Sequence, residues 1–150
     1  MAERRPLSAS LEDYLETIYL IVQDKQAARA KDIVERLGVH NSSVTQALRS
    51  LSEKGLVNYA PSDLVTLTEE GRAAAADVLE RHQSLRSFLI EVLGLDPDRA
   101  EEDACRLEHD VSQELAERLR RFMAYRSEHP EQVARWDHDR GEFGAPARES

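Results

Sequence analysis

The stretch that decides the fold is Ala30-Lys-Asp-Ile-Val-Glu-Arg-Leu37, followed by Gly38-Val-His-Asn41 and by Ser42-Ser-Val-Thr-Gln-Ala-Leu-Arg-Ser-Leu-Ser-Glu-Lys54. The first segment predicts a short helix, and Gly38 is suited to its left-handed C-cap. The third segment predicts a second helix that ends in a basic turn before a glycine. Its apolar positions share one face, which we expect to be buried: Val44, Leu48 and Leu51. Two short helices joined by a few residues form a helix-turn-helix.

Two β-rich runs follow these helices. Leu56-Val-Asn-Tyr59 and Leu64-Val-Thr-Leu67 flank Ala60-Pro-Ser-Asp63, and this pattern predicts a β-hairpin. A hairpin directly after a helix-turn-helix is typical of a winged helix-turn-helix. The fold class predicted for the whole chain is therefore mainly α, with a small hairpin wing.

Helical patterns also flank this core. We expect a first helix over 10–24, with Ser10 and Asp13 forming a capping box. A long helix is predicted from Thr68 to about Leu93, and a further one from about 98 to 126, either continuous or interrupted.

We expect three parts in the chain. Residues 1–72 form the winged helix-turn-helix domain and residues 73–140 a helical domain, with one more turn around Trp136. Residues 141–150, which are rich in Gly, Pro and Ala, are predicted to be a disordered tail.

The start of the second helix of the pair offers short polar side chains that could face base edges in a major groove. Gln46 can pair with adenine through two hydrogen bonds, and nearby cations are placed to contact phosphates. The alternative is a solvated helix start, since Ser and Asn are ordinary N-caps. The wing tip Pro61-Ser62-Asp63 lacks a cation. The candidate DNA-binding residues are Arg29, Lys31, Asn41, Ser42, Ser43, Thr45, Gln46 and Arg49.

The charge is divided unevenly along the 150 residues, whose net value of −9 argues mildly against a nucleic-acid binder. Residues 1–72 carry 11 acidic and 9 basic side chains, a net charge of −2. Residues 73–150 carry 18 acidic and 11 basic side chains, a net charge of −7. The acidity therefore belongs mainly to the second half.

Composition also bears on location. The single cysteine, Cys105, excludes an intramolecular disulfide framework and favours the cytoplasm. No apolar run approaches the roughly 20 residues of a membrane span, and the N-terminus has no apolar signal-peptide core.

Several metal-ligand side chains occur at helical spacing. Asp13 and Glu16 share a face of the first helix, and Cys105, Glu108 and His109 are predicted to share a face of a later one. His82 lies in the long helix between them. Carboxylates, imidazoles and a thiolate from three helices would form a transition-metal site suited to Mn(II) or Fe(II).

Each ligand also has an ordinary structural interpretation. First-turn acids complement a helix N-terminus, and a lone cysteine often acts as a small buried hydrophobe. Two other functions therefore stay open: a metal-independent winged-helix regulator, and a helical metalloenzyme. The first predicts DNA affinity that is insensitive to chelator, and the second predicts turnover when metal is loaded.

The chain resembles the diphtheria toxin repressor and manganese transport regulator family over about residues 8–135. The motifs that carry the resemblance are Ser10–Tyr19, Val39–Gln46, Gly55–Val57, Leu67–Arg72 and Cys105–Ser112. The resemblance implies a metal-activated, homodimeric transcriptional repressor that controls metal homeostasis genes. Its N-terminal winged helix would bind a palindromic double-stranded operator, and its helical domain would dimerise and bind Mn(II) or Fe(II).

The match to the family's two branches is mixed. Asp13 and Glu16 resemble the manganese branch, whereas Cys105 resembles the iron branch. Arg86 and Glu101 replace residues of the iron branch's ancillary site, and we expect no counterpart of the SH3-like domain of larger iron repressors in these 150 residues. Glu108, His109 and His82 match both branches. In the recognition helix two arginines of the toxin repressor are replaced, by Ser50 and Glu53.

Overall fold

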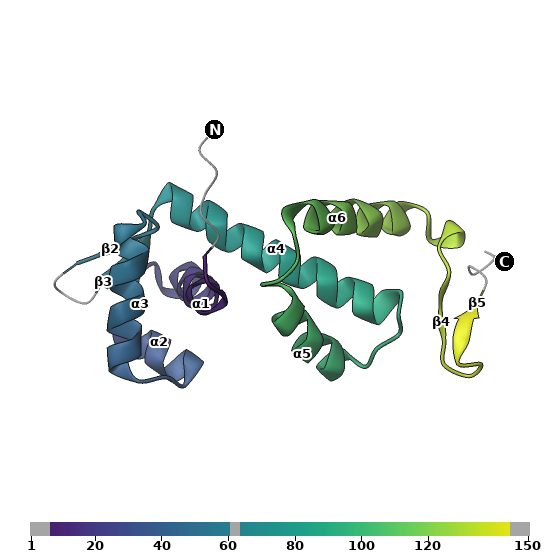
Figure 1. Ribbon diagram of the computed structural model, residues 1–150, viewed down its shortest axis with the longest axis horizontal. Helices are drawn as coiled ribbons and strands as arrows, with labels where there is room; N and C mark the ends of the chain where they lie inside the picture. The colour runs from purple at the N-terminus through teal and green to yellow at the C-terminus, as the bar shows by residue number, and fades with distance from the viewer. Residues whose placement is uncertain (1–6, 61–63, 145–150) are drawn as a thin grey trace. The chain divides into compact units, whose positions relative to one another are not determined.

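A computed structural model describes residues 7–60 and 64–144 of the chain. It divides into two compact units, Met1–Leu79 and Glu80–Ser150. Figure 1 labels the elements of both units. No helix in the described ranges is both long enough and apolar enough to cross a membrane.

The N-terminal unit combines α1, α2, α3 and the first part of a fourth helix with a three-stranded antiparallel sheet. Figure 1 labels these helices. The strand order is β1-β3-β2, and Val57 pairs with Leu67 while Ala28 pairs with Val65. The winged helix-turn-helix and its hairpin are thus confirmed, and β1 is an addition. The elements are α1 (Ala9–Lys25), β1 (Ala28–Arg29), α2 (Ala30–Leu37), α3 (Asn41–Glu53), β2 (Val57–Tyr59) and β3 (Leu64–Leu67).

An apolar core holds this unit together. Residues at helical spacing on α1 and α3 turn toward the sheet, and alternate residues of β3 face them. Burial of each large aliphatic side chain contributes about 1.5–3 kcal/mol relative to exposure. The fully buried members include Leu15, Ile18, Ile33, Val44, Leu48, Leu51 and Val65.

The ends of the helices follow from local chemistry. The Ser8 hydroxyl, rather than Ser10, caps α1 by accepting from the Leu11 amide at 3.2 Å, so the predicted capping box at Ser10 is wrong. Gly38 has φ 64° after α2, which confirms the left-handed cap that only glycine adopts without strain.

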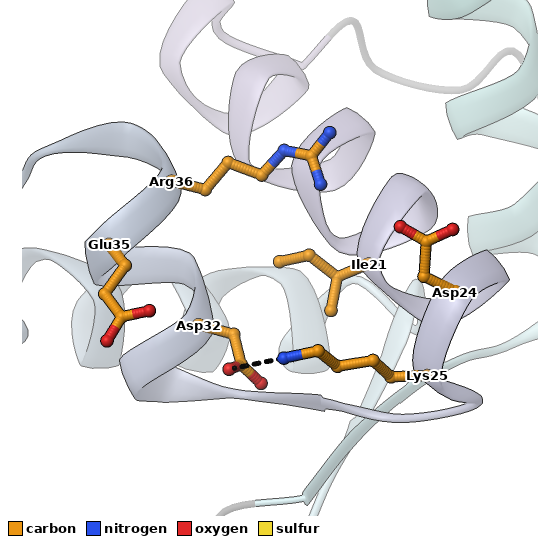
Figure 2. Close-up of a pocket in the computed structure, with 6 residues that line it drawn as sticks. All are labelled: Ile21, Asp24, Lys25, Asp32, Glu35 and Arg36. Carbon is orange, nitrogen blue, oxygen red and sulfur yellow. Dashed lines mark hydrogen bonds and ion pairs between the residues drawn. The ribbon is translucent and has the colours of Figure 1, made fainter.

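An ion pair ties the end of α1 to the start of α2. Lys25 Nζ lies 3.2 Å from Asp32 Oδ1, across a pocket of about 270 Å³ (Figure 2). The other Asp32 oxygen accepts from the Arg29 amide at 3.0 Å. Burial opposes ionisation, but the hydrogen bonds from Arg29 and Lys25 outweigh it and lower the pKa of Asp32.

Helix α4 (Glu69–Glu91) runs from one unit into the other, because the division falls after Leu79 rather than at the expected 72/73 boundary. The rest of the C-terminal unit is mostly helical, with a final hairpin. Its elements are α5 (Pro97–Leu107), α6 (Gln113–Glu128), the 3₁₀ turn η1 (Pro130–Gln132), β4 (Arg135–Asp137) and β5 (Glu142–Gly144).

One question left open by the sequence is answered in this region, and one prediction needs correction. The helix expected over about 98–126 is interrupted after Leu107 and restarts at Gln113, where the Ser112 hydroxyl caps α6. The disordered tail expected over 141–150 is wrong at Glu142–Gly144, which pairs with Arg135–Asp137. Residues 145–150 lie outside the described ranges. The Trp136 amide donates to Val92 O at 2.9 Å, so the hairpin is anchored on the end of α4.

The core of the C-terminal unit is small. Four buried residues form it, and partly buried neighbours such as Phe88 and Leu119 pack against them. The buried members come from α4 and α5: Leu85, Leu89, Ala100 and Ala104. The small alanines let α5 approach α4 closely, and this brings the polar residues on those helices into contact.

Candidate metal centre and nucleic-acid interface

His82 is the centre of a polar cluster in the C-terminal unit. It lies on α4 with only 9% of its surface exposed. Its Nδ1 lies 2.6 Å from Glu108 Oε2, and its Nε2 lies 3.0 Å from Glu101 Oε1. The imidazole therefore contacts one carboxylate on each side.

Glu108 is the most deeply buried charged residue of the cluster, with 2% of its surface exposed. It follows the last residue of α5, and its backbone carbonyl accepts from Arg81 Nη1 at 2.8 Å. Its second carboxylate oxygen lies 3.4 Å from His109 Nε2. A buried carboxylate is costly unless it is paired, and here it lies between two imidazoles.

These contacts change the protonation of His82. The hydrogen bond with Glu108, with the charges of Glu108 and Glu101, outweighs the opposing effect of burial and raises the pKa of His82 to about 9. At neutral pH the ring therefore carries two protons and donates from both nitrogens. A cation that binds through His82 must displace one of these protons.

Cys105 adds a sulfur to the cluster. It lies on α5, its Sγ is 3.9 Å from His82 Nδ1 and 3.8 Å from Glu101 Oε1, and the residue is exposed. The ligand atoms of His82, Glu101 and Cys105 all lie within 4.8 Å of one another. Nitrogen, oxygen and sulfur donors this close together fit a divalent transition metal.

The structure brings together the four expected ligands of this unit: His82, Cys105, Glu108 and His109. Cys105 lies in α5, which ends at Leu107, whereas Glu108 and His109 lie in the turn that follows, so these three residues are not on one continuous helix as predicted. Glu108 keeps helical backbone angles, and its carboxylate lies 2.6 Å from His82 Nδ1. Glu101 was not among the expected ligands, although its position four residues before Cys105 places both on one face.

Asp13 and Glu16 belong to the N-terminal unit. Both lie on α1, Asp13 exposed and Glu16 half-buried, at the expected i and i+3 positions. The other four expected ligands belong to the C-terminal unit. Their participation in a metal site therefore stays a prediction at this point.

The expected DNA-contacting residues gather at α3 and near the start of α2. Most of the side chains at the start of α3 are exposed, and so is Arg49 further along it. Thr45 differs, because it is half-buried and its hydroxyl donates to Asn41 O at 3.1 Å. The exposed members are Arg29, Lys31, Asn41, Ser42, Ser43, Gln46 and Arg49. The expected wing tip, Pro61-Ser62-Asp63, lies outside the described residues.

Comparison with known families decides what these two units are. Residues 6–64 match the model of the iron-dependent repressor N-terminal DNA-binding domain. Residues 68–137 match the model of the iron-dependent repressor metal-binding and dimerisation domain. The chain belongs to the iron-dependent repressor family. The resemblance inferred from the sequence motifs is confirmed, and the polar cluster lies in the domain that binds metal in this family.

Individual relatives agree with this assignment. The chain is 42% identical over 118 residues to an HTH-type transcriptional regulator of Methanocaldococcus jannaschii, covering 78% of this chain and 94% of the other. It is 39% identical over 121 residues to the transcriptional regulator MntR of Escherichia coli O157:H7, covering 81% and 76%. Among solved structures, a manganese-dependent transcriptional repressor in complex with manganese matches with 33% identity and a TM-score of 0.68. That match covers 91% of this chain and 62% of the solved one.

Members of this family are transcriptional regulators. This chain is accordingly a metal-dependent DNA-binding regulator with a dimerisation domain, and not an enzyme. The two alternatives left open by the sequence, a metal-independent regulator and a metalloenzyme, are thereby set aside.

Proposed function

We propose that this regulator senses Mn(II), with Fe(II) as the alternative effector, and represses metal homeostasis genes as a homodimer on a palindromic operator. The observation that carries the proposal is the buried cluster of His82, Glu108 and His109 with the Cys105 thiol beside it. Carboxylates and imidazoles suit Mn(II) and Fe(II) alike. The manganese-dependent relative favours Mn(II).

We further propose that Asp13 and Glu16 complete the site. Without a bound cation, the carboxylates of Asp13, Glu16 and Glu108 repel one another and leave α1 loosely held. The bound ion supplies the positive charge that offsets these carboxylates. The full proposed ligand set is Asp13, Glu16, His82, Cys105, Glu108 and His109.

Metal binding would thereby hold the DNA-binding unit in the arrangement that recognises the operator. Helix α3 would enter the major groove, with Gln46 and the residues before it facing base edges. Phosphates would be held by the cations Arg29, Lys31 and Arg49 and by the hydroxyls at the start of α3. Two copies of α3 in a dimer then match two half-sites. The proposed DNA contacts are Arg29, Lys31, Asn41, Ser42, Ser43, Thr45, Gln46 and Arg49.

The role as a DNA-binding regulator also bears on where the protein is located in the cell. A single cysteine and a function on chromosomal DNA support a place in the cytoplasm, where thiols stay reduced.

Metal-dependent operator binding tests the proposal. Operators are first selected from a random-sequence duplex pool with MnCl₂ present, and the affinity for a selected duplex is then measured under anaerobic conditions. The titrations use Mn(II), Fe(II) and chelator in turn. We expect strong binding with Mn(II), weaker or equal binding with Fe(II), and loss in chelator. Equal affinity in chelator would contradict the proposal.

A further inference from the structure

The cluster has two sides, divided by the His82 ring. The two nitrogens of an imidazole point away from each other. On the Nδ1 side lies the Glu108 carboxylate at 2.6 Å, and on the Nε2 side lies Glu101 at 3.0 Å. The Cys105 sulfur lies 3.9 Å from Nδ1 and 3.8 Å from Glu101 Oε1. The buried carboxylate, Glu108, is therefore on the Nδ1 side, and the exposed one, Glu101, is on the Nε2 side.

Glu101 already has a contact for each of its oxygens. Its Oε1 faces His82 Nε2, and its Oε2 lies 2.8 Å from Arg86 Nε. The Arg86 guanidinium supplies positive charge and an N–H donor to this carboxylate. The arginine thus holds the carboxylate in the orientation in which it accepts from the imidazole.

Helical spacing and the packing of α4 against α5 hold these side chains together. His82 and Arg86 lie one turn apart on α4, and Glu101 and Cys105 lie one turn apart on α5. The buried alanines Ala100 and Ala104 keep the two helices in close contact. The ring, the carboxylate and the guanidinium therefore form a chain across the α4–α5 contact.

We propose that Glu101 and Arg86 are positioning residues for the metal centre rather than ligands. Glu101 accepts from His82 Nε2–H, and this fixes the tautomer and the ring orientation in which Nδ1 presents its lone pair to the metal. Histidine ligands commonly donate their other N–H to a carboxylate, and loss of that carboxylate typically weakens metal binding 10–100-fold. This proposal rests on the proposed function, because it takes His82 as a ligand.

The nitrogen that holds the metal can be observed directly. We would record ¹H–¹⁵N spectra of the ¹⁵N-histidine-labelled full chain loaded with Zn(II), with His82→Gln to assign the signals. The proposal predicts metal at His82 Nδ1 and a proton at Nε2. Metal at Nε2 would overturn the positioning role but leave His82 as a ligand. If neither nitrogen binds Zn(II), the ligand set of the proposed function is wrong and the positioning role falls with it.

Variants of Glu101 separate positioning from ligation. Free Mn(II) is followed by its electron paramagnetic resonance signal during titration of each protein. Glu101→Ala should weaken Mn(II) binding roughly 10–100-fold. Glu101→Gln keeps an oxygen that accepts from Nε2–H and should retain most of the affinity. If Glu101→Gln fails as badly as Glu101→Ala, Glu101 is a ligand itself and the positioning role is wrong.

Two neighbours supply matched controls. Glu102 is the next residue of α5 and is exposed, so Glu102→Ala should leave Mn(II) affinity unchanged. Arg86→Gln should weaken binding by less than Glu101→Ala, because Glu101 stays but loses its anchor. Arg99→Gln, which removes another exposed arginine that pairs with Asp103 at 3.4 Å, should have no effect. If Arg86→Gln and Arg99→Gln have the same Mn(II) affinity, Arg86 has no positioning role.

Discussion

The two units of the molecule are stabilised in different ways. The N-terminal unit has a continuous apolar core to which every one of its helices contributes. The C-terminal unit has a core of four buried apolar residues, and beside it lies a carboxylate that is buried between two histidines. Apolar contacts therefore dominate the interior of the first unit, whereas the interior of the second also holds ionisable side chains.

A second difference lies in the surfaces that the units leave uncovered. In α6, every residue of which is described, no side chain is buried. Large apolar residues of the C-terminal unit are exposed instead, among them Leu107 at 43%, Leu115 at 51% and Tyr125 at 46%. An apolar surface of this kind suits a unit that pairs with a second copy, in agreement with a dimerisation domain.

The largest expected effect is in the core of the N-terminal unit. Leu48→Ala should lower the free energy of unfolding by about 2–5 kcal/mol, because Leu48 is fully buried and its loss leaves a cavity. Thermal unfolding followed by circular dichroism measures the change. A loss below about 1 kcal/mol would show that this core is less important than its burial indicates.

A substitution on the exposed face of α6 should change self-association rather than the free energy of unfolding. Leu115→Asp places a charge on this surface, so we expect self-association to weaken about tenfold or more, equal to about 1.4 kcal/mol. Sedimentation equilibrium measures the association. Arg118→Asp, at an exposed position three residues after Leu115 on the same helix, controls for added negative charge. Unchanged association of Leu115→Asp would place the dimer surface elsewhere.

The polar cluster should make the metal-free C-terminal unit sensitive to pH. The pKa of His82 is raised above its usual 6.5 to about 9, so its contribution to stability is complete below pH 6.5. That contribution is lost as the pH rises through about 9. We would compare the melting temperatures of the wild-type protein and His82→Gln in chelator between pH 6 and 10. The difference should shrink at high pH, and a constant difference would contradict the coupling of His82 to Glu108.

The smallest expected effect is at the start of α2. Asp32→Ala removes the acceptor for the Arg29 amide and for Lys25, and should cost about 1 kcal/mol in urea unfolding. Because the pKa of Asp32 is lowered, the loss should be full at neutral pH and should fade as the pH falls below 3.8. Glu35→Ala, an exposed acid on the same helix, is the control. An equal loss in both variants would show that the cap is not responsible.

The difference between the two units also explains what could be predicted from the sequence. The helix-turn-helix and its hairpin follow from local signals, namely apolar spacing, Gly38 and the turn before Leu64, and these were predicted close to their observed bounds. The strand β1 was missed because two residues, Ala28 and Arg29, carry no alternation that could reveal it.

The metal centre could be predicted only in part. The sequence indicates His82, Cys105, Glu108 and His109 as residue types at suggestive spacing, but it leaves open whether the helix is interrupted after Leu107, because the apolar stripe continues beyond it. Which carboxylate faces which imidazole depends on the packing of α5 against α4. No short-range pattern encodes that contact, so the role of Glu101 emerged only from the structure.

The central claim is that metal binding and DNA binding are coupled through the proposed ligands. The most direct test compares operator affinity with and without Mn(II) for the wild-type protein, His109→Ala and Asp13→Ala, with folding checked by circular dichroism. The account predicts that Mn(II) strengthens operator binding by the wild-type protein and that both variants lose most of this response. Variants that bind the operator in chelator as tightly as the Mn(II)-loaded wild type would contradict it.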